Sequence, residues 1–157
     1  EPSDIDVFGL NKESLDNFAE VNLSKTKAAM VTKNATTYLY NNQLIQLIHG
    51  KYFDGLQTAL DNFDFTICQF GWDGKDVYST IPAITSVLRK HLAVHKITRE
   101  FSADSLRRAF KYQLKGYIPC AGTVRDLAQS FVNLTKEEIQ SQVELSPGGG
   151  IRMVKFD

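Results

Sequence analysis

The residues on either side of Pro82 follow different patterns, and this change limits the folds that the chain can form. Before Pro82, short β-rich runs alternate with turn-forming residues and with two helical segments, at 11–19 and 56–60. After Pro82, apolar residues recur at the spacing of amphipathic helices. A chain with mixed strands and helices first and helices later is typical of the α+β class, so we predict an α+β fold that ends in a short helical part.

The strands are predicted from runs rich in β-branched and aromatic residues. Asn41-Asn42-Gln43 and Asp73-Gly74 each separate two such runs and therefore predict hairpin turns. Asp-Gly is favoured because both residues of a two-residue hairpin turn need positive φ. The predicted strands are residues 4–8, 28–32, 36–40, 44–48, 63–72 and 75–79.

The helices after Pro82 are predicted from their caps and apolar stripes. Ser102 is a candidate N-cap, and Gly116 stands beyond the end of the same helix. Thr135 and Glu138 form a capping-box pattern that opens a further short helix. The other predicted helices cover residues 83–92, 102–115 and 123–132. The apolar stripe of the helix at 102–115 consists of Leu106, Ala109, Phe110 and Leu114.

The 157 residues, of which 43% are hydrophobic, suffice for one packed domain. We expect a sheet region at 1–81, a helical region at 82–145, and a Gly-rich linker and tail at 146–157. Two cysteines without CxxC spacing predict free thiols in a reducing compartment. No run approaches about 18 consecutive apolar residues and no signal peptide opens the sequence, which predicts a cytoplasmic protein without a membrane partner.

The net charge is zero, but the charges are unevenly distributed. Residues 1–74 contain ten acidic side chains and five lysines, whereas residues 75–118 contain nine basic side chains and three acidic ones. This distribution suits a carboxylate metal site that faces a polyphosphate site, and it also suits many ordinary domains. His91 and His95 would share a helix face, for which a solvated basic face is favoured over a metal pair.

Three aspartates predict a site for divalent cations. Asp4 and Asp6 lie two residues apart on a predicted strand, so both carboxylates project from the same face. Mg²⁺ prefers oxygen ligands and commonly takes one or two carboxylates together with substrate phosphates. Asp64, between Phe63 and Phe65, offers a third carboxylate from another predicted strand. Two alternatives stay open: Asp4 and Asp6 belong to a solvated face, and Asp64 is a core acid bonded to backbone amides.

Three segments together resemble the nucleotidyltransferase superfamily that includes DNA polymerase β. Residues 4–8, with the sequence Asp-Ile-Asp-Val-Phe, resemble its metal-binding strand. Two further stretches resemble segments of the head of bacterial CCA-adding enzyme and poly(A) polymerase, in the same order and at similar spacing. They are residues 64–67, followed by 72–74, and residues 101–108. The chain also resembles compact phage and large-virus relatives of these enzymes.

The resemblance implies a small mixed or antiparallel nucleotidyltransferase-like sheet and a metal-dependent enzyme. The implied reaction moves a nucleoside monophosphate from an NTP to an RNA, protein or small-molecule acceptor, in the host cytoplasm for a phage-encoded protein. The implied catalytic residues, which would bind two Mg²⁺ or Mn²⁺ ions, are Asp4, Asp6 and Asp64. The implied nucleotide-binding residues are Ser3, Arg107, Arg108 and Lys111.

Departures from the family pattern support an alternative. Only Glu1-Pro2-Ser3 precede Asp4, whereas the family has a Gly-Ser turn further upstream, so catalysis is expected only if the complete chain carries that turn. Asn62 and Phe63 replace two arginines, and Phe110 replaces a third. The alternative is a catalytically degenerate module of the same fold, with a structural role in a virion or a binding and inhibitory role.

Overall fold

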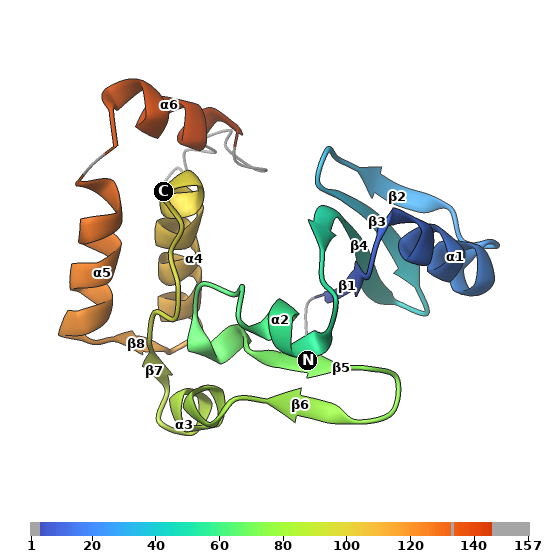
Figure 1. Ribbon diagram of the computed structural model, residues 1–157, viewed down its shortest axis with the longest axis horizontal. Helices are drawn as coiled ribbons and strands as arrows, with labels where there is room; N and C mark the ends of the chain where they lie inside the picture. The colour runs from blue at the N-terminus through green and yellow to red at the C-terminus, as the bar shows by residue number, and fades with distance from the viewer. Residues whose placement is uncertain (1–3, 133, 146–157) are drawn as a thin grey trace, which may run out of the picture. The chain divides into compact units, whose positions relative to one another are not determined.

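The computed structural model describes residues 4–132 and 134–145 (Figure 1). By packing, the chain divides into two compact units, residues 1–59 and residues 60–157. Parallel and antiparallel strand pairs occur together with helices, which confirms the predicted α+β class. The functional division that we predicted after residue 81 stays a prediction, and the predicted Gly-rich tail lies outside the described residues.

Unit 1 (residues 1–59) is built on one sheet. Its elements are β1 (Ile5–Gly9), α1 (Lys12–Leu23), β2 (Ala28–Val31), β3 (Ala35–Tyr40) and β4 (Gln43–Tyr52). The strand order is β1-β4-β3-β2, in which β1 runs parallel to β4 and the other neighbours are antiparallel. α1 contacts β1 and β4 and buries Leu15 and Leu23, and Leu47 of β4 is buried as well.

The turn between β3 and β4 follows from its two asparagines. Asn41 and Asn42 have φ angles of 48° and 66°, in the left-handed region that asparagine tolerates better than most residues. Tyr40 therefore pairs with Gln43 across a two-residue turn. This arrangement confirms the hairpin that the sequence predicted here.

Unit 2 (residues 60–157) combines small sheets with helices. α2 (Leu56–Leu60) leads into it, and two 3₁₀ turns follow, η1 (Thr66–Cys68) and, later, η2 (Arg99–Phe101). The remaining elements are β5 (Phe70–Trp72), β6 (Val77–Ser79), α3 (Ile81–Leu88), β7 (His91–Leu92), α4 (Ser102–Leu114), β8 (Ile118–Pro119), α5 (Ala121–Phe131) and α6 (Lys136–Leu145). β5 and β6 form an antiparallel hairpin, and β7 and β8 form a parallel pair.

The predicted strand at 63–72 was wrong over most of its length, because only Phe70–Trp72 form a strand, β5. Phe65 instead bridges Val94, the Thr66 amide donates to the Ala93 carbonyl at 3.0 Å, and η1 follows. The hairpin turn is also longer than predicted. The Asp73 carboxylate accepts hydrogen bonds from the Lys75 and Asp76 amides at 2.9 and 2.8 Å, which closes a four-residue loop.

The helix predicted at 83–92 ends at Leu88, as α3. The residues that follow, His91 and Leu92, pair with β8, which lies almost thirty positions later in the chain. This long-range pairing takes the backbone out of the helix, so His91 and His95 do not share a helix face. The metal-pair alternative for these two histidines depended on a shared helix face, and that helix does not extend to them.

The core of unit 2 joins segments that are distant in the sequence. Phe65 and Leu92 are fully buried, and they pack in one cluster with Ala109 of α4 and Leu127 of α5. α4 and α5 therefore lie side by side, as Figure 1 shows in yellow and orange. This packing brings together the two helix faces that form the groove described below.

α6 is held by its cap and by contacts to the segment before α4. Thr135 and Glu138 exchange hydrogen bonds, with the Thr135 amide donating to the Glu138 carboxylate at 2.7 Å and the Glu138 amide donating to the Thr135 hydroxyl at 3.2 Å. This confirms the predicted capping box. Arg99 also donates to the Glu138 carboxylate, at 2.7 Å.

Each helix of the described residues is too short or too polar to cross a bilayer.

Candidate functional site

Asp64 is a buried carboxylate with several hydrogen-bond donors around it. Its side chain is 12% exposed. Oδ1 accepts a hydrogen bond from the Phe65 amide at 3.0 Å and lies 3.2 Å from the Arg108 guanidinium. Oδ2 accepts a hydrogen bond from the Ser105 hydroxyl at 3.1 Å. These contacts match the interpretation of Asp64 as a core acid with partners of its own.

Two opposing effects act on the pKa values of Asp64 and Arg108: burial of the two groups and the attraction between their charges. Burial raises the pKa of the Asp64 carboxyl above its usual value, although the Arg108 charge and the Ser105 hydrogen bond act in the opposite direction. Burial alone would lower the pKa of the Arg108 guanidinium, but the acidic groups of Asp64, Tyr112 and Cys68 outweigh it and raise that pKa. Arg108 therefore stays charged and compensates Asp64.

Arg108 also joins a wider polar cluster inside unit 2. Its guanidinium donates to the Tyr112 hydroxyl at 3.0 Å and to the Cys68 sulfur at 3.3 Å. The Cys68 sulfur lies 3.0 Å from the same Tyr112 hydroxyl, and burial raises the pKa of its thiol. Tyr112 packs edge-on against Phe65, with ring centroids 5.7 Å apart. The Arg108 side chain thus has intramolecular partners, and its role in binding a nucleotide stays a prediction.

The other predicted nucleotide-binding residues have exposed side chains or are not described. Arg107 pairs with Asp104 on the surface of α4, at 2.9 Å. Lys111 is exposed on the same helix. Ser3 lies outside the described residues. Binding of an NTP by these side chains stays a prediction.

Asp6 lies in β1 and Asp4 directly precedes that strand, both in unit 1. Asp6 is opposite Gln46 of β4, and the Gln46 side-chain amide donates to the Asp4 carboxylate at 3.2 Å. Asp64 belongs to unit 2, so a metal site shared by all three aspartates, with two Mg²⁺ or Mn²⁺ ions, stays a prediction. Within residues 4–132 and 134–145, no three His, Cys, Asp or Glu side chains form a group that could hold a metal ion.

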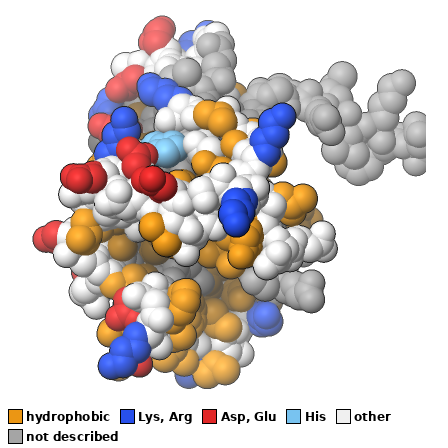
Figure 2. Space-filling view, turned by 90° about the vertical axis from the view of Figure 1, so that its right-hand side faces the viewer, with side chains coloured by type: hydrophobic (Ala, Val, Ile, Leu, Met, Phe, Trp, Pro, Cys, Tyr) orange, Lys and Arg blue, Asp and Glu red, His pale blue; other side chains and the backbone are white. Residues whose placement is uncertain are grey.

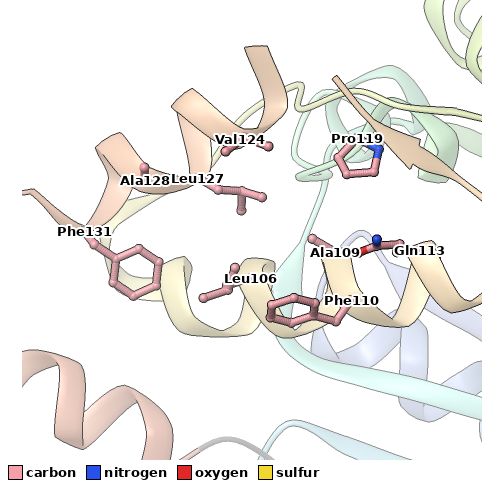
Figure 3. Close-up of a pocket in the computed structure, with 9 residues that line it drawn as sticks. All are labelled: Leu106, Ala109, Phe110, Gln113, Pro119, Val124, Leu127, Ala128 and Phe131. Carbon is pink, nitrogen blue, oxygen red and sulfur yellow. The ribbon is translucent and has the colours of Figure 1, made fainter. Parts of the chain in front are cut away.

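An apolar groove runs between α4 and α5 and encloses about 320 Å³ (Figure 3). Each helix contributes residues at positions i, i+3, i+4 and i+7, which form a single stripe because 3.6 residues make one turn. Figure 3 shows the two stripes facing each other across the groove. The lining residues are Leu106, Ala109, Phe110, Gln113, Pro119, Val124, Leu127, Ala128 and Phe131.

The groove differs from the other exposed apolar side chains because it is concave. Large apolar side chains are also exposed in unit 1, among them Met30 and Leu39, and Figure 2 shows such side chains scattered among acidic and basic ones. In the groove, Phe110 is 60% exposed and Val124 is 57% exposed. Both line a volume that a partner's side chains could fill.

The sequence analysis identified the stripe on α4 but not the groove. Leu106, Ala109 and Phe110 carry the predicted periodicity, and Ala109 is indeed buried. Phe110 and Leu114 stay exposed, because α5 covers only one edge of the stripe. Val124 and Leu127 are three residues apart, like Leu106 and Ala109 on α4. This spacing was the sequence signal that could have located the α5 wall of the groove.

Cys120 is a free, exposed cysteine whose thiol pKa is lowered, a shift that the sequence did not indicate. It is the N-cap of α5, and its sulfur accepts a hydrogen bond from the Thr123 amide at 3.5 Å. Hydrogen bonds with the Thr123 hydroxyl and amide, and a smaller one with His91, lower the pKa of the thiol to about 6. Cys68, in contrast, is half-buried and its thiol pKa is raised.

We expect iodoacetamide to alkylate Cys120 at least about tenfold faster than Cys68 at pH 7, because an exposed thiolate reacts faster than a buried thiol. The rate at Cys120 should rise with pH through a midpoint near 6. Peptide mass spectrometry at timed intervals measures both rates in one sample. The Cys120→Ser chain should retain only the slow reaction, and equal rates at the two thiols would contradict the expectation.

The chain forms two small α+β units, and the second unit carries an open apolar groove between two helices. A model of the Gabija anti-defense 2 family (Gad2) matches residues 1–90, which is more than half of the chain. The chain therefore belongs to the Gabija anti-defense 2 family. The match ends just after α3 and does not include α4 or α5.

A curated relative supports this assignment. The protein "Gabija anti-defense 2" of Bacillus phage SPbetaL7 is 24% identical to the chain over 162 residues. The alignment includes the whole chain but only 39% of the relative, so the chain spans about two fifths of that protein's length. A relative from a phage agrees with our expectation of a phage or viral protein.

The family match corrects the resemblance to nucleotidyltransferases. That resemblance was wrong, because the chain matches the Gabija anti-defense 2 family instead. Its motifs were short, and a pair of aspartates on a strand is compatible with many folds. The structure shows why one of them misled: residues 64–67 do not form the expected strand, and Asp64 pairs with Arg108.

Proposed function

We propose that the chain acts in the host cell by binding a protein of the Gabija defence system and inhibiting it. This is the binding and inhibitory alternative that the sequence left open. Its support is the family to which the chain belongs and the name of the phage relative. The expected partner is a protein, and no NTP or RNA enters the proposal.

The groove between α4 and α5 is the observation that carries the proposal. Fully burying a side chain such as Phe or Val contributes roughly 1.5–3 kcal/mol, and Phe110 and Val124 are both more than half exposed. Concave surfaces with an apolar centre are typical of sites at which proteins anchor one another. The family match stops short of α4, so the groove's role is proposed from its geometry.

The test compares binding and protection for a groove variant and a matched control. Phe110→Ser/Val124→Ser removes two exposed apolar side chains from the groove. Trp72→Ser/Val77→Ser removes an aromatic residue and a valine of similar exposure, 68% and 76%, from the β5–β6 hairpin. We expect the parent chain to co-elute with a purified Gabija protein and to restore plaques on Gabija-positive bacteria. The groove variant should lose both properties, and the control should keep them.

A third variant separates this proposal from nucleotide transfer. Asp4→Asn/Asp6→Asn removes two carboxylates and leaves the groove intact. Restoration of plaques by this variant is expected if the chain acts by binding. Loss of protection in this variant alone, with binding and the groove variant unaffected, would overturn the proposal and favour chemistry at the two aspartates.

A further inference from the structure

We propose that the α4–α5 groove binds an acidic amphipathic helix of its protein partner. This inference rests on the proposed function and names the kind of segment that the groove accepts.

The lining favours apolar side chains over a polar ligand. Gln113 is the one polar side chain among the lining residues that the structure describes. A phosphate or a sugar placed there would lose its hydration without gaining ionic partners. A volume of about 320 Å³ suits a few aliphatic or aromatic side chains. The groove is therefore built for the apolar face of a partner segment.

The walls of the groove favour a helix as that segment. Both long walls are helices, whose backbone amides and carbonyls bond within each helix, so they leave no strand edge to which a β-strand could add. The lining of α4 extends from Leu106 to Gln113, about 10 Å along its axis. This length corresponds to about two helical turns, so three or four apolar residues at i, i+3, i+4 and i+7 would fill it.

The charges at the rim favour acidic flanks on the partner helix. On α4, Arg107 follows the lining residue Leu106 by one position, which places it about 100° around the helix, beside the groove. On α5, Arg125 follows the lining residue Val124 in the same way. Lys111 lies seven positions after Asp104 and therefore on the far side of α4.

The acids nearest these two arginines point elsewhere. Asp104 and Asp126 stand two positions from the lining residues Leu106 and Val124, about 200° around their helices. Their ion pairs with Arg107 and Arg125 are 2.9 Å long but exposed. Exposed pairs contribute little, about 0–1 kcal/mol, so the arginines can turn toward carboxylates of a partner. The rim thus presents positive charge on both sides of an apolar floor.

The direct test uses a synthetic probe of defined chemistry. The probe is a fluorescein-labelled peptide of about 15 residues, long enough for helix formation, with Leu at i, i+3, i+4 and i+7 and Glu beside them. Fluorescence anisotropy against the full chain measures its affinity. Two control peptides have Lys in place of Glu, or the leucines in scrambled order. We expect the acidic peptide to bind at least about tenfold more tightly than either control.

Variants of the chain locate the binding. Phe110→Ser/Val124→Ser and, separately, Arg125→Glu should each weaken binding of the peptide about tenfold, the second more strongly at low salt. The Arg125 side chain is 76% exposed, so its variant tests the rim without disturbing the core. Trp72→Ser/Val77→Ser should bind the peptide as the parent chain does. Circular dichroism of each variant confirms that it is folded.

The outcomes separate this inference from the proposed function. If a Gabija protein binds the chain but neither the groove variant nor Arg125→Glu weakens that complex, the groove inference is wrong and the proposed function stands. If the peptide binds as expected but no Gabija protein does, the proposed partner is wrong and the helix-binding groove stands. Any of three results would overturn the inference. The three peptides bind equally, the groove binds phosphatidylserine vesicles instead of the peptide, or the chain forms a dimer that Phe110→Ser/Val124→Ser dissociates.

Discussion

Replacement of Arg108 by methionine is expected to lower the free energy of unfolding by about 3 kcal/mol. The substitution keeps the length of the side chain but leaves the Asp64 carboxylate without its positive partner. Breaking a buried ion pair in this way costs about 3–5 kcal/mol. We expect the lower end, because the Arg108 side chain is 35% exposed whereas that of Asp64 is 12% exposed. Urea denaturation at pH 7, followed by circular dichroism, measures the change.

The neighbouring arginine offers a matched control. Arg107 also pairs with an aspartate on α4, but its side chain is 52% exposed. Arg107→Met should therefore change the free energy of unfolding by less than about 1 kcal/mol. The double variant Asp64→Asn/Arg108→Met should be more stable than Arg108→Met alone, because it removes the unpaired charge. Equal losses for Arg107→Met and Arg108→Met would show that Asp64 does not depend on Arg108.

Replacement of Phe65 by alanine is expected to lower the free energy of unfolding by about 3–5 kcal/mol, as for other large-to-small changes in protein cores. Phe65 is fully buried in the cluster that joins β7, α4 and α5, and its ring packs against Tyr112. Its loss leaves a cavity where these elements meet. The same denaturation experiment measures the effect.

Phe70→Ala is the control for this variant. Phe70 lies on β5 and is 41% exposed, so its truncation removes less buried surface. We expect a loss well below that of Phe65→Ala, about 1 kcal/mol. Similar losses for the two phenylalanines would mean that the cluster around Phe65 is not the core of unit 2.

α4 connects the polar cluster to the groove. Arg108 and Phe110 stand two positions apart and therefore point about 200° apart around the helix. One side of α4 is tied to Asp64 and Cys68, and the other side lines the groove with Phe110. The ion pair thus holds in place a helix whose opposite face is exposed for binding. In the proposed function, the role of Arg108 would be to position α4.

The local parts of the fold could be predicted from the sequence. The capping box of α6, the hairpin of β3 and β4 and the helical nature of α4 and α5 all formed as expected. Each depends on residues a few positions apart: Thr135 with Glu138, and Asn41 with Asn42. Their physical causes are hydrogen bonds and backbone angles within one turn, which the sequence displays directly.

The parts that were predicted wrongly depend on distant contacts. The strand expected around Asp64 gave way to a 3₁₀ turn because Phe65 and Thr66 bond to the segment near Val94 and Ala93. α3 ended early because His91 pairs with β8. The family resemblance failed for a related reason: short motifs do not specify the contacts that distinguish one fold from another.

The sequence by itself therefore determined the class of fold, the capping box of α6, the turn between β3 and β4, and the apolar stripe of α4. It did not determine every cap and turn: Ser102, predicted as an N-cap, is the first residue of α4, and the turn after β5 has four residues. Only the tertiary structure decided that Asp64 is a partner of Arg108, and that the stripes of α4 and α5 meet along one edge and remain open along the other. The physical reason is that burial and pairing are properties of surfaces brought together from distant parts of the chain. A stripe has the same spacing in the sequence whether a core or a partner protein covers it.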